Sequence, residues 1–428
     1  MRLLLGQLYD VSTTLEIEKH CVGDVLVPTS RLDADALSGA VNYLLHKFPT
    51  LRASFISKND ELSMRFCDPC DLLADRMFQV RPAARHPLEL RDQLVSYIDE
   101  VRASMSLDQP PLLRYCLFDA QCASEQRLVI IFNHLVCDGI SSRIIWRELS
   151  RAYKSLLAGK ALEAEPCATY QIFAQELLDR HRQLAPEPSV GIPFEPGSGL
   201  LDKLTYGLAC TCTVAEVVRK ERRICGADLS AVRAHAAEAG IGLSDFLLAC
   251  WVQSLAKVQS TGNVGLLMWV SPHFVGDWAT PVTDLVGSVS FPLPVTFSLD
   301  RHRSFTKTLQ SVDEELRRGL SNAEDFAARY FGGEKQSAPT VLPCIGFNFV
   351  SDQRPGASLI GYELAPEGIH IERLSQEPFE LALGLDIELY GQQMHVSLSA
   401  TPRVAARLSM DELIEDLLTS FEKTACET

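Results

Sequence analysis

The sequence predicts an α+β protein made of two lobes, each with its own sheet and helices. Its 428 residues are 46% hydrophobic and 22% charged, a composition typical of a folded chain with room for two or three packed units. One breaker region, 181–199, contains four prolines and three glycines and has no hydrophobic period. We therefore expect an N-terminal lobe at 1–180, a Pro/Gly-rich connection at 181–199 and a C-terminal lobe at 200–428.

Helix and strand patterns both occur in the N-terminal lobe. Apolar residues recur every three or four positions over 37–48, which predicts a helix with Asp33 or Asp35 as its cap. Residues 128–132, LVIIF, form a short apolar run that predicts a buried strand. The apolar stripe of 140–157 predicts a second helix directly after this strand.

The C-terminal lobe shows the same mixture. The spacing of apolar residues over 247–258 predicts a helix with Ser244 as its cap. Strands are expected at 264–270, 344–350, 381–390 and 394–398. The glycine-rich motifs of phosphate-binding loops are absent from the sequence, which argues against nucleotide chemistry.

Charge and hydropathy exclude two classes of partner. The chain has 40 Lys and Arg against 55 Asp and Glu, a formal charge of −15. A global basic surface for nucleic acid or an anionic membrane is therefore not expected. The N-terminal leucines are interrupted by Gly, Gln and Asp, and no stretch of about 20 apolar residues occurs. We expect a cytoplasmic protein without membrane contact.

The thirteen cysteines predict neither a disulfide framework nor a metal site. Their number is odd, the chain is long, and several lie in apolar runs where a thiol behaves as a small hydrophobic group. A zinc site would have to combine Cys67 and Cys70 with Cys210 and Cys212, which lie far away in the sequence without a second CxxC motif. We expect no metal.

One motif has the residues for catalysis. The segment 131–140, IFNHLVCDGI, places His134, Asp138 and Gly139 where the buried strand turns into the next helix. Such a turn aims a side chain well, and His is a base near neutral pH. Asp138 would orient the loop, and Gly139 would keep the passage free of bulk or adopt a φ that other residues avoid. A buried core histidine beside a helix-capping Asp-Gly pair fits the pattern equally well.

Six segments, in the order of the family, resemble the condensation domains of nonribosomal peptide synthetases, which belong to the coenzyme A-dependent acyltransferase superfamily. HxxxDG at 134–139 is the signature of that superfamily. The others are HKFPTLRASF at 46–55, TYQIFA at 169–174, VGSVSFPLP at 286–294, GFNF at 346–349 and the strand at 379–387, which are similar to the family's RHExLRTxF, YxDFA, VGxFVNTLP, FNY and FDLTLSL segments. Residues 226–258 also look like the helical pair that opens the second lobe of the family.

This resemblance implies two chloramphenicol acetyltransferase-like lobes in a V-shaped pseudo-dimer with a channel between them. His134 would lie in the channel, reached by a thioester from one face and by a nucleophile from the other. It would take the proton from the attacking amine or hydroxyl, or position that nucleophile, and Asp138 would be structural. Because the thioester is already activated, no covalent enzyme intermediate is needed.

Three departures from the family pattern concern the site. Asn133 replaces the first His of HHxxxDG. In the family an Arg pairs with the motif Asp, and in this chain His273 stands near the position of that Arg. The expected partner of Asp138 is therefore His273, with Arg52 and Lys47 as fallback candidates. The family's HQDxPFE segment is missing before the FNY-like strand.

Further polar side chains are candidates for binding. Asn133, Ser288, Ser290 and Asn348 are the expected substrate-binding residues, the last three as donors to a tetrahedral oxyanion. The basic segment RKERR at 219–223 fits docking of an acidic carrier protein or a phosphopantetheine phosphate. It also fits the charged edge of a sheet, which we favour.

The resulting hypothesis is a freestanding condensation-type acyltransferase. It forms an amide or ester from an acyl or peptidyl thioester on a carrier protein met in trans, with a small-molecule amine or alcohol as acceptor. We expect no tightly bound cofactor, since the donor is a phosphopantetheine-linked acyl group. One alternative is an O- or N-acyltransferase that uses acyl-coenzyme A directly. The other is a catalytically inactive condensation-like module that binds a partner.

Overall fold

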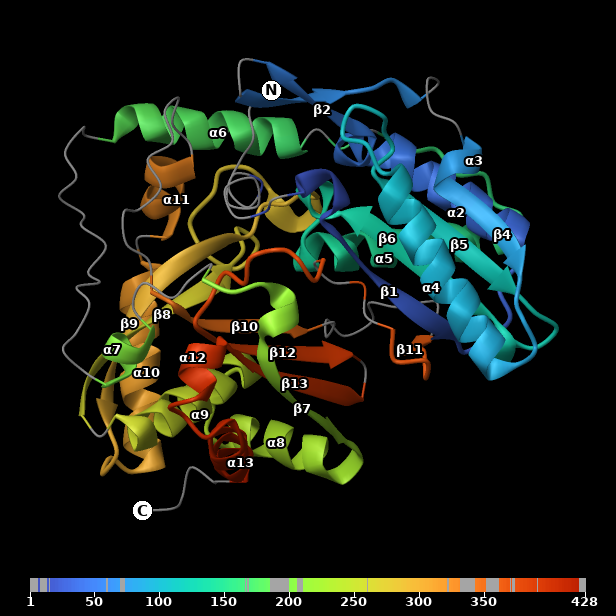
Figure 1. Ribbon diagram of the computed structural model, residues 1–428. Helices are drawn as coiled ribbons and strands as arrows, with labels where there is room; N and C mark the ends of the chain where they lie inside the picture. The colour runs from blue at the N-terminus through green and yellow to red at the C-terminus, as the bar shows by residue number, and fades with distance from the viewer. Residues whose placement is uncertain are drawn as a thin grey trace. The chain divides into compact units, whose positions relative to one another are not determined.

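The computed structural model (Figure 1) describes most of the chain. The described residues are 7, 14, 16–58, 61–69, 74–165, 167, 169–184, 200–205, 211–259, 261–321, 323–331, 343–351, 362–369, 371, 374–390 and 392–422. The expected connection at 181–199 lies mostly outside them.

The chain forms two units, each described by itself. Unit 1 comprises Met1–Glu176, Trp278–Ser290 and Asp352–Leu374, and unit 2 comprises Leu177–Asp277, Phe291–Ser351 and Ser375–Thr428. Unit 1 therefore contains two late segments and differs in this from the contiguous lobe expected at 1–180. Local sequence patterns predict elements, but they do not say which unit a later segment rejoins. The expected V shape and channel stay predictions.

A five-stranded sheet in the order β11-β1-β6-β5-β4 forms the core of unit 1. Its strands are β1 (Cys21–Pro28), β4 (Phe78–Pro82), β5 (Leu113–Asp119), β6 (Arg127–Asn133) and β11 (Tyr362–Leu364). β6 pairs antiparallel with both β1 and β5, and all of its residues are buried. The buried strand expected at 128–132 is thereby confirmed. A separate ribbon is formed by β2 (Ala53–Lys58) and β3 (Glu61–Phe66).

The helices of unit 1 confirm the predicted ones at 37–48 and 140–157. They are α2 (Ala34–Lys47), α3 (Ala74–Met77), α4 (Pro87–Ser104), α5 (Gly139–Leu157) and the first part of α6 (Thr169–Gln183), with short 3-10 turns η1 (Ile17–Lys19), η2 (Pro49–Arg52), η4 (Ala123–Glu125), η5 (His134–Val136) and η7 (Val282–Asp284). α2 packs against α5. Of the two expected caps of α2, Asp33 is the actual one, because its Oδ1 accepts the Ala36 N–H at 2.8 Å.

A six-stranded sheet in the order β7-β13-β12-β10-β8-β9 forms the core of unit 2. Its strands are β7 (Val218–Cys225), β8 (Thr261–Val270), β9 (Phe291–Asp300), β10 (Ile345–Ser351), β12 (Leu383–Tyr390) and β13 (Gln393–Ala400). Its helices are α7 (Leu200–Thr205), α8 (Gly226–Glu238), α9 (Leu243–Val258), α10 (Phe305–Leu320), α11 (Ala323–Phe331), α12 (Pro402–Ala405) and α13 (Met410–Phe421), with the 3-10 turn η6 (Val214–Glu216). α9 packs against α8, α10 and α13, and its Trp251 is wholly buried.

Most predictions for unit 2 are confirmed. The strands expected at 264–270, 344–350, 381–390 and 394–398 correspond to β8, β10, β12 and β13. Ser244 as a helix cap is wrong, because α9 begins at Leu243 after Gly242 and Ser244 lies within its first turn. The charged-edge interpretation of 219–223 is confirmed. The segment lies on the edge strand β7, where Lys220 and Arg222 pair with two acidic residues of α13.

Among the helices that the structure describes, none alone is long and apolar enough to span a membrane. α8 and α9 meet the length and composition criteria only when taken together, across a bend of 96°.

Gly23 allows β1 to approach β6, the strand that leads to the candidate site. A Cβ at this position would lie 1.9 Å from the Ile130 carbonyl oxygen, which belongs to the backbone and cannot move aside alone. We expect Gly23→Ala to lower the free energy of unfolding by about 2–4 kcal/mol, measured by urea denaturation. Gly39→Ala in α2 is the control, because its Cβ would meet only the flexible end of Leu156. Equal losses in both variants would contradict this explanation.

Candidate functional site

The candidate site begins where β6 ends. Asn133 is the last residue of the strand, and η5 and α5 follow it directly. The ladder between β1 and β6 continues one residue further, because the His134 N–H donates to the His20 carbonyl oxygen at 2.9 Å. His134 is half-buried. Its backbone is thus anchored to a buried sheet, as the sequence predicted for the turn between strand and helix.

The ring of His134 stacks on the ring of His20. The ring centroids are 4.9 Å apart, and the two planes differ by 3°. His20 is buried, with 5% of its surface exposed, and its Nδ1 lies 3.4 Å from the Thr14 hydroxyl oxygen. No sequence pattern marked His20, because it precedes β1 and lies far from the motif along the chain.

Asn133 holds the turn together. Its Nδ2 donates to the carbonyl oxygens of Ile17 at 2.8 Å and Glu18 at 3.1 Å, and its Oδ1 accepts the Leu135 N–H at 3.0 Å. The side chain has no exposed surface. The amide is thus wholly buried and bonded to the turns on either side of His134, which differs from the predicted contact with substrate.

Asp138 connects the start of α5 to the segment 287–290. Its Oδ1 caps the helix by accepting the Ser141 N–H at 2.8 Å. Its Oδ2 accepts the N–H groups of Val289 at 3.0 Å and Ser290 at 2.8 Å, and also the Ser290 hydroxyl at 2.8 Å. Only 2% of the residue is exposed. Four donors therefore satisfy a buried carboxylate, which holds the segment 287–290 to the start of α5.

The cationic partners expected for Asp138 are not found. Arg52 donates from Nε to the Leu45 carbonyl at 2.8 Å and from its guanidinium to the Cys67 carbonyl. Lys47 pairs with another carboxylate. Nδ1 of His273 lies 2.7 Å from the Ser271 hydroxyl, in unit 2. Within the described parts of the chain, Asp138 forms no ion pair, because backbone and hydroxyl donors occupy both of its oxygens.

Gly139 and Cys137 flank this carboxylate. Gly139 is exposed and begins α5, and it is not among the described glycines with positive φ, so the expectation of an unusual φ is wrong. Burial raises the pKa of the Cys137 thiol well above its ordinary value, and the charge of Asp138 adds to this effect. Cys137 is therefore a protonated thiol and unsuited as a nucleophile.

The expected oxyanion donors are engaged elsewhere or buried. The Ser290 hydroxyl donates to Asp138, as described above. Ser288 has no exposed surface. Asn348 lies on β10 and donates to Asp386 of β12 at 3.2 Å, within unit 2. The structure thus gives Ser290 and Asn348 partners inside the protein, which differs from the predicted contact with substrate.

The segment 278–290 is held at several points along its length. The Ser141 hydroxyl donates to the Gly287 carbonyl at 2.7 Å and accepts the Gly287 N–H at 3.0 Å. Gly287 is needed for close packing, because a Cβ there would lie 2.5 Å from the Tyr170 ring. At the other end, the Glu176 carboxylate accepts the N–H groups of Ala279 and Thr280 at 2.7 and 2.8 Å.

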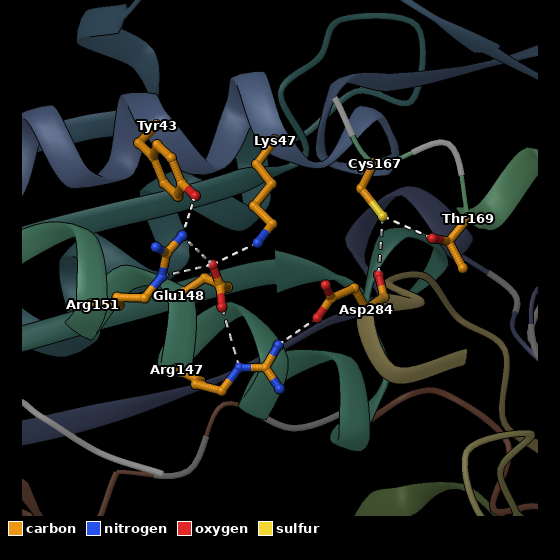
Figure 2. A network of polar contacts seen from close by, with 8 residues as sticks. All are labelled: Tyr43, Lys47, Arg147, Glu148, Arg151, Cys167, Thr169 and Asp284. Atoms are coloured by element: carbon orange, nitrogen blue, oxygen red, sulfur yellow. Dashed lines mark hydrogen bonds and ion pairs between the residues drawn. The ribbon is translucent and has the colours of Figure 1, made fainter. Parts of the chain in front are cut away.

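A polar network ties the middle of this segment to α5 (Figure 2). Arg147 donates to the Asp284 carboxylate at 2.6 Å and to Glu148 at 3.2 Å. Glu148 also accepts Lys47 of α2 at 2.6 Å and Arg151 at 2.9 Å. The segment that binds Asp138 is therefore anchored twice on α5, once at the helix start and once two turns later.

Glu148 is the centre of this network and is expected to contribute stability that depends on pH. Burial alone would raise the pKa of its carboxyl group, but hydrogen bonds from Lys47 and Arg151 lower the pKa below its ordinary value of 4.5. A depressed pKa in the folded state means stability that is present above pH 4.5 and is lost as the pH falls through the folded-state value.

We expect Glu148→Gln to lower the free energy of unfolding by about 1–3 kcal/mol at neutral pH, because Lys47, Arg147 and Arg151 each lose one anionic partner. The difference from the wild type should shrink in acid, and urea denaturation across this pH range measures it. Glu314→Gln, at an exposed position of α10, is the control. A difference that grows in acid would contradict the assignment.

A buried glutamine also supports the turn. Gln7 has no exposed surface, and its Nε2 donates to the Leu135 carbonyl at 2.6 Å. Its Oε1 accepts the Tyr170 hydroxyl at 2.9 Å. No sequence signal marked Gln7, since it stands in an apolar N-terminal run. No group of three or more His, Cys, Asp or Glu that could hold a metal occurs among the described residues, and Cys70 and Cys210 lie outside them.

Known proteins with similar sequences belong to the nonribosomal peptide synthetases. A family model described as "Condensation domain" matches residues 6–186. The chain is 26% identical to a linear gramicidin synthase protein of Brevibacillus parabrevis, over 94% of this chain and 5% of that protein. It is 35% identical to a mycosubtilin synthase protein of Bacillus subtilis, over 77% of this chain and 13% of that protein. The chain thus spans a small part of the length of these relatives.

Solved structures share the fold. The epimerization domain from the third module of tyrocidine synthetase B matches with a TM-score of 0.77 at 16% identity, over 98% of this chain and 96% of that one. The X-domain from teicoplanin biosynthesis matches with a TM-score of 0.65 at 16% identity, over 100% and 95%. A condensation domain of the enacyloxin polyketide synthase matches with 0.63 at 19%, over 95% and 78%. These likenesses confirm the predicted fold class.

Proposed function

Because the chain belongs to the condensation-domain family of nonribosomal peptide synthetases, we propose that it is an acyltransferase that joins a carrier-bound acyl or peptidyl thioester to an amine or hydroxyl acceptor. The observation that supports this most is His134, a half-buried imidazole whose backbone is bonded to the end of a buried sheet. Asn133, Gln7 and Asp138 anchor the turn that carries this imidazole.

The proposed reaction uses the imidazole as a proton carrier. The acceptor nitrogen or oxygen forms a bond to the thioester carbonyl carbon, and its proton passes to His134. The carbon–sulfur bond then breaks, and the leaving thiolate takes up the proton from the imidazolium. No covalent enzyme intermediate is needed, which agrees with the raised thiol pKa of Cys137.

The donor is proposed to be a phosphopantetheine-linked acyl group on a carrier protein, as the synthetase relatives suggest. Carrier proteins of this kind are usually acidic, and the chain itself has a formal charge of −15. Long-range attraction is therefore weak, and docking would depend on a local patch. A condensation domain mediates chain release from the enacyloxin polyketide synthase, and for this chain we propose a small-molecule amine or alcohol as the acceptor. That the chain acts as a freestanding enzyme stays a prediction.

A product assay tests the proposal. The protein is incubated with acylated carrier proteins or acyl-coenzyme A donors, and with amine or alcohol acceptors, and products are followed by mass spectrometry. Condensation from carrier donors that is lost in His134→Ala supports the proposal. Turnover with coenzyme A donors alone favours the coenzyme A-dependent alternative. If the configuration at the α-carbon of the carrier-bound acyl group is inverted in the absence of an acceptor, the protein is an epimerase. Carrier binding without turnover, unchanged in His134→Ala, indicates a partner-binding module.

A further inference from the structure

His20 is a buried, ring-bearing residue in direct contact with His134, and the proposed reaction has no proton step for it. From the parallel stack of the two rings we propose that His20 is a positioning residue that sets the plane of the His134 ring. This inference rests on the proposed function of His134 and deepens it.

The position of His20 is set from both sides. It lies directly after η1 and directly before β1, and its carbonyl oxygen accepts the His134 N–H at 2.9 Å. The carbonyl oxygens of Ile17 and Glu18, in the turn that leads to His20, accept the two donor bonds of the Asn133 amide. Asn133, which precedes His134 in the sequence, therefore holds η1 in place, and His20 follows η1 directly.

This arrangement matters because the backbone alone does not determine the plane of an imidazole. The terminal torsion of His is broad, with no sharp staggered minima. Proton transfer requires that the nitrogen lone pair, which lies in the ring plane, points at the proton of the acceptor. Productive geometry tolerates deviations of about 10–20°. A buried ring that lies within 3° of parallel to the His134 ring restricts rotation of that ring out of the shared plane.

Three variants separate the flat ring of His20 from its polar atoms. His20→Phe keeps a flat ring, His20→Asn keeps a polar group close to the Thr14 hydroxyl, and His20→Ala keeps neither. We expect Ala and Asn to lower kcat about tenfold with KM changed less than about twofold, and Phe to stay within about threefold of the wild type. Wild-type kcat in His20→Ala overturns the proposal, and so does a Phe variant that falls as far as Ala.

A second measurement does not depend on activity. The ten histidines are labelled with ¹³C, and the His134 ring signals are assigned by their loss in His134→Ala. Ring order parameters from relaxation report how freely His134 rotates. We expect greater mobility of the His134 ring in the Ala and Asn variants and wild-type mobility in the Phe variant. Equal mobility in all variants overturns the proposal.

The two measurements also separate this inference from the proposed function. If His134→Ala keeps full turnover, the proposed function fails, while the ring mobility still reports whether His20 orders His134. His235→Ala is the control for removing a partly buried histidine: its Nδ1 contacts the Phe421 carbonyl at 3.0 Å in unit 2. That variant is expected to change neither kcat nor the mobility of the His134 ring.

Discussion

Replacing His134 with Ala is expected to lower the turnover of a carrier-bound thioester by about 10²–10⁴-fold, the usual contribution of a general base. The remaining rate comes from the positioning of the donor and acceptor, which the substitution leaves in place. Single-turnover kinetics with saturating acceptor is the measurement, because it reports the chemical step without product release. The loss should appear in kcat and leave the KM for the acceptor nearly unchanged.

The stability of His134→Ala should be close to that of the wild type. The His134 side chain is half-buried, and its backbone bond to His20 does not depend on the ring. We expect the free energy of unfolding to change by less than about 1 kcal/mol. His302→Ala is the matched control, since His302 is exposed in the turn after β9. A loss of turnover below about threefold, or an equal loss in both variants, would refute the role of His134 as a base.

The part of the site that is continuous in sequence could be predicted, for a physical reason. The continuous apolar run 128–132 predicts the buried strand β6, and the apolar stripe of 140–157 predicts the helix α5, each from its own residues alone. His134 and Asp138 stand between these elements, so the structure had to place them on a strand-to-helix turn. The capping role of Asp138 follows from the same local pattern, and the structure confirms it.

The contacts that hold the turn could not be predicted, because they join distant parts of the chain. The Asn133 amide and the Ile17 carbonyl are 116 residues apart, and Asp138 and the Val289 N–H are 151 residues apart. The donors to Asp138 are mostly backbone N–H groups, which have no sequence signature. The predicted partners were therefore the side chains of His273 and Arg52, whereas Val289 and Ser290, which bind Asp138, belong to a late segment of unit 1.

Removing the Asp138 carboxylate is expected to have the largest effect on stability. Asp138→Ala leaves the N–H groups of Ser141, Val289 and Ser290 without their acceptor at a position where 2% of the residue is exposed. It also removes the cap of α5. We expect a loss of about 3–5 kcal/mol in the free energy of unfolding, measured by urea denaturation, because unsatisfied buried donors cost more than a lost bond. Turnover should fall as well, because η5, which begins with His134, ends two residues before Asp138.

Two further variants separate the parts of this interaction. In Asp138→Asn the NH₂ group of the amide points at a backbone N–H donor in either orientation of the amide, because both oxygens of Asp138 accept N–H groups. We therefore expect the free energy of unfolding to fall by about 2–3 kcal/mol. Ser290→Ala removes one donor and leaves the carboxylate three others, which should cost about 1 kcal/mol. Because the Ser290 hydroxyl loses its partner in Asp138→Ala, the double variant should cost less than the sum of the single ones. Strict additivity, or a loss below about 1 kcal/mol in Asp138→Ala, would show that the carboxylate does not hold α5 to the segment 287–290.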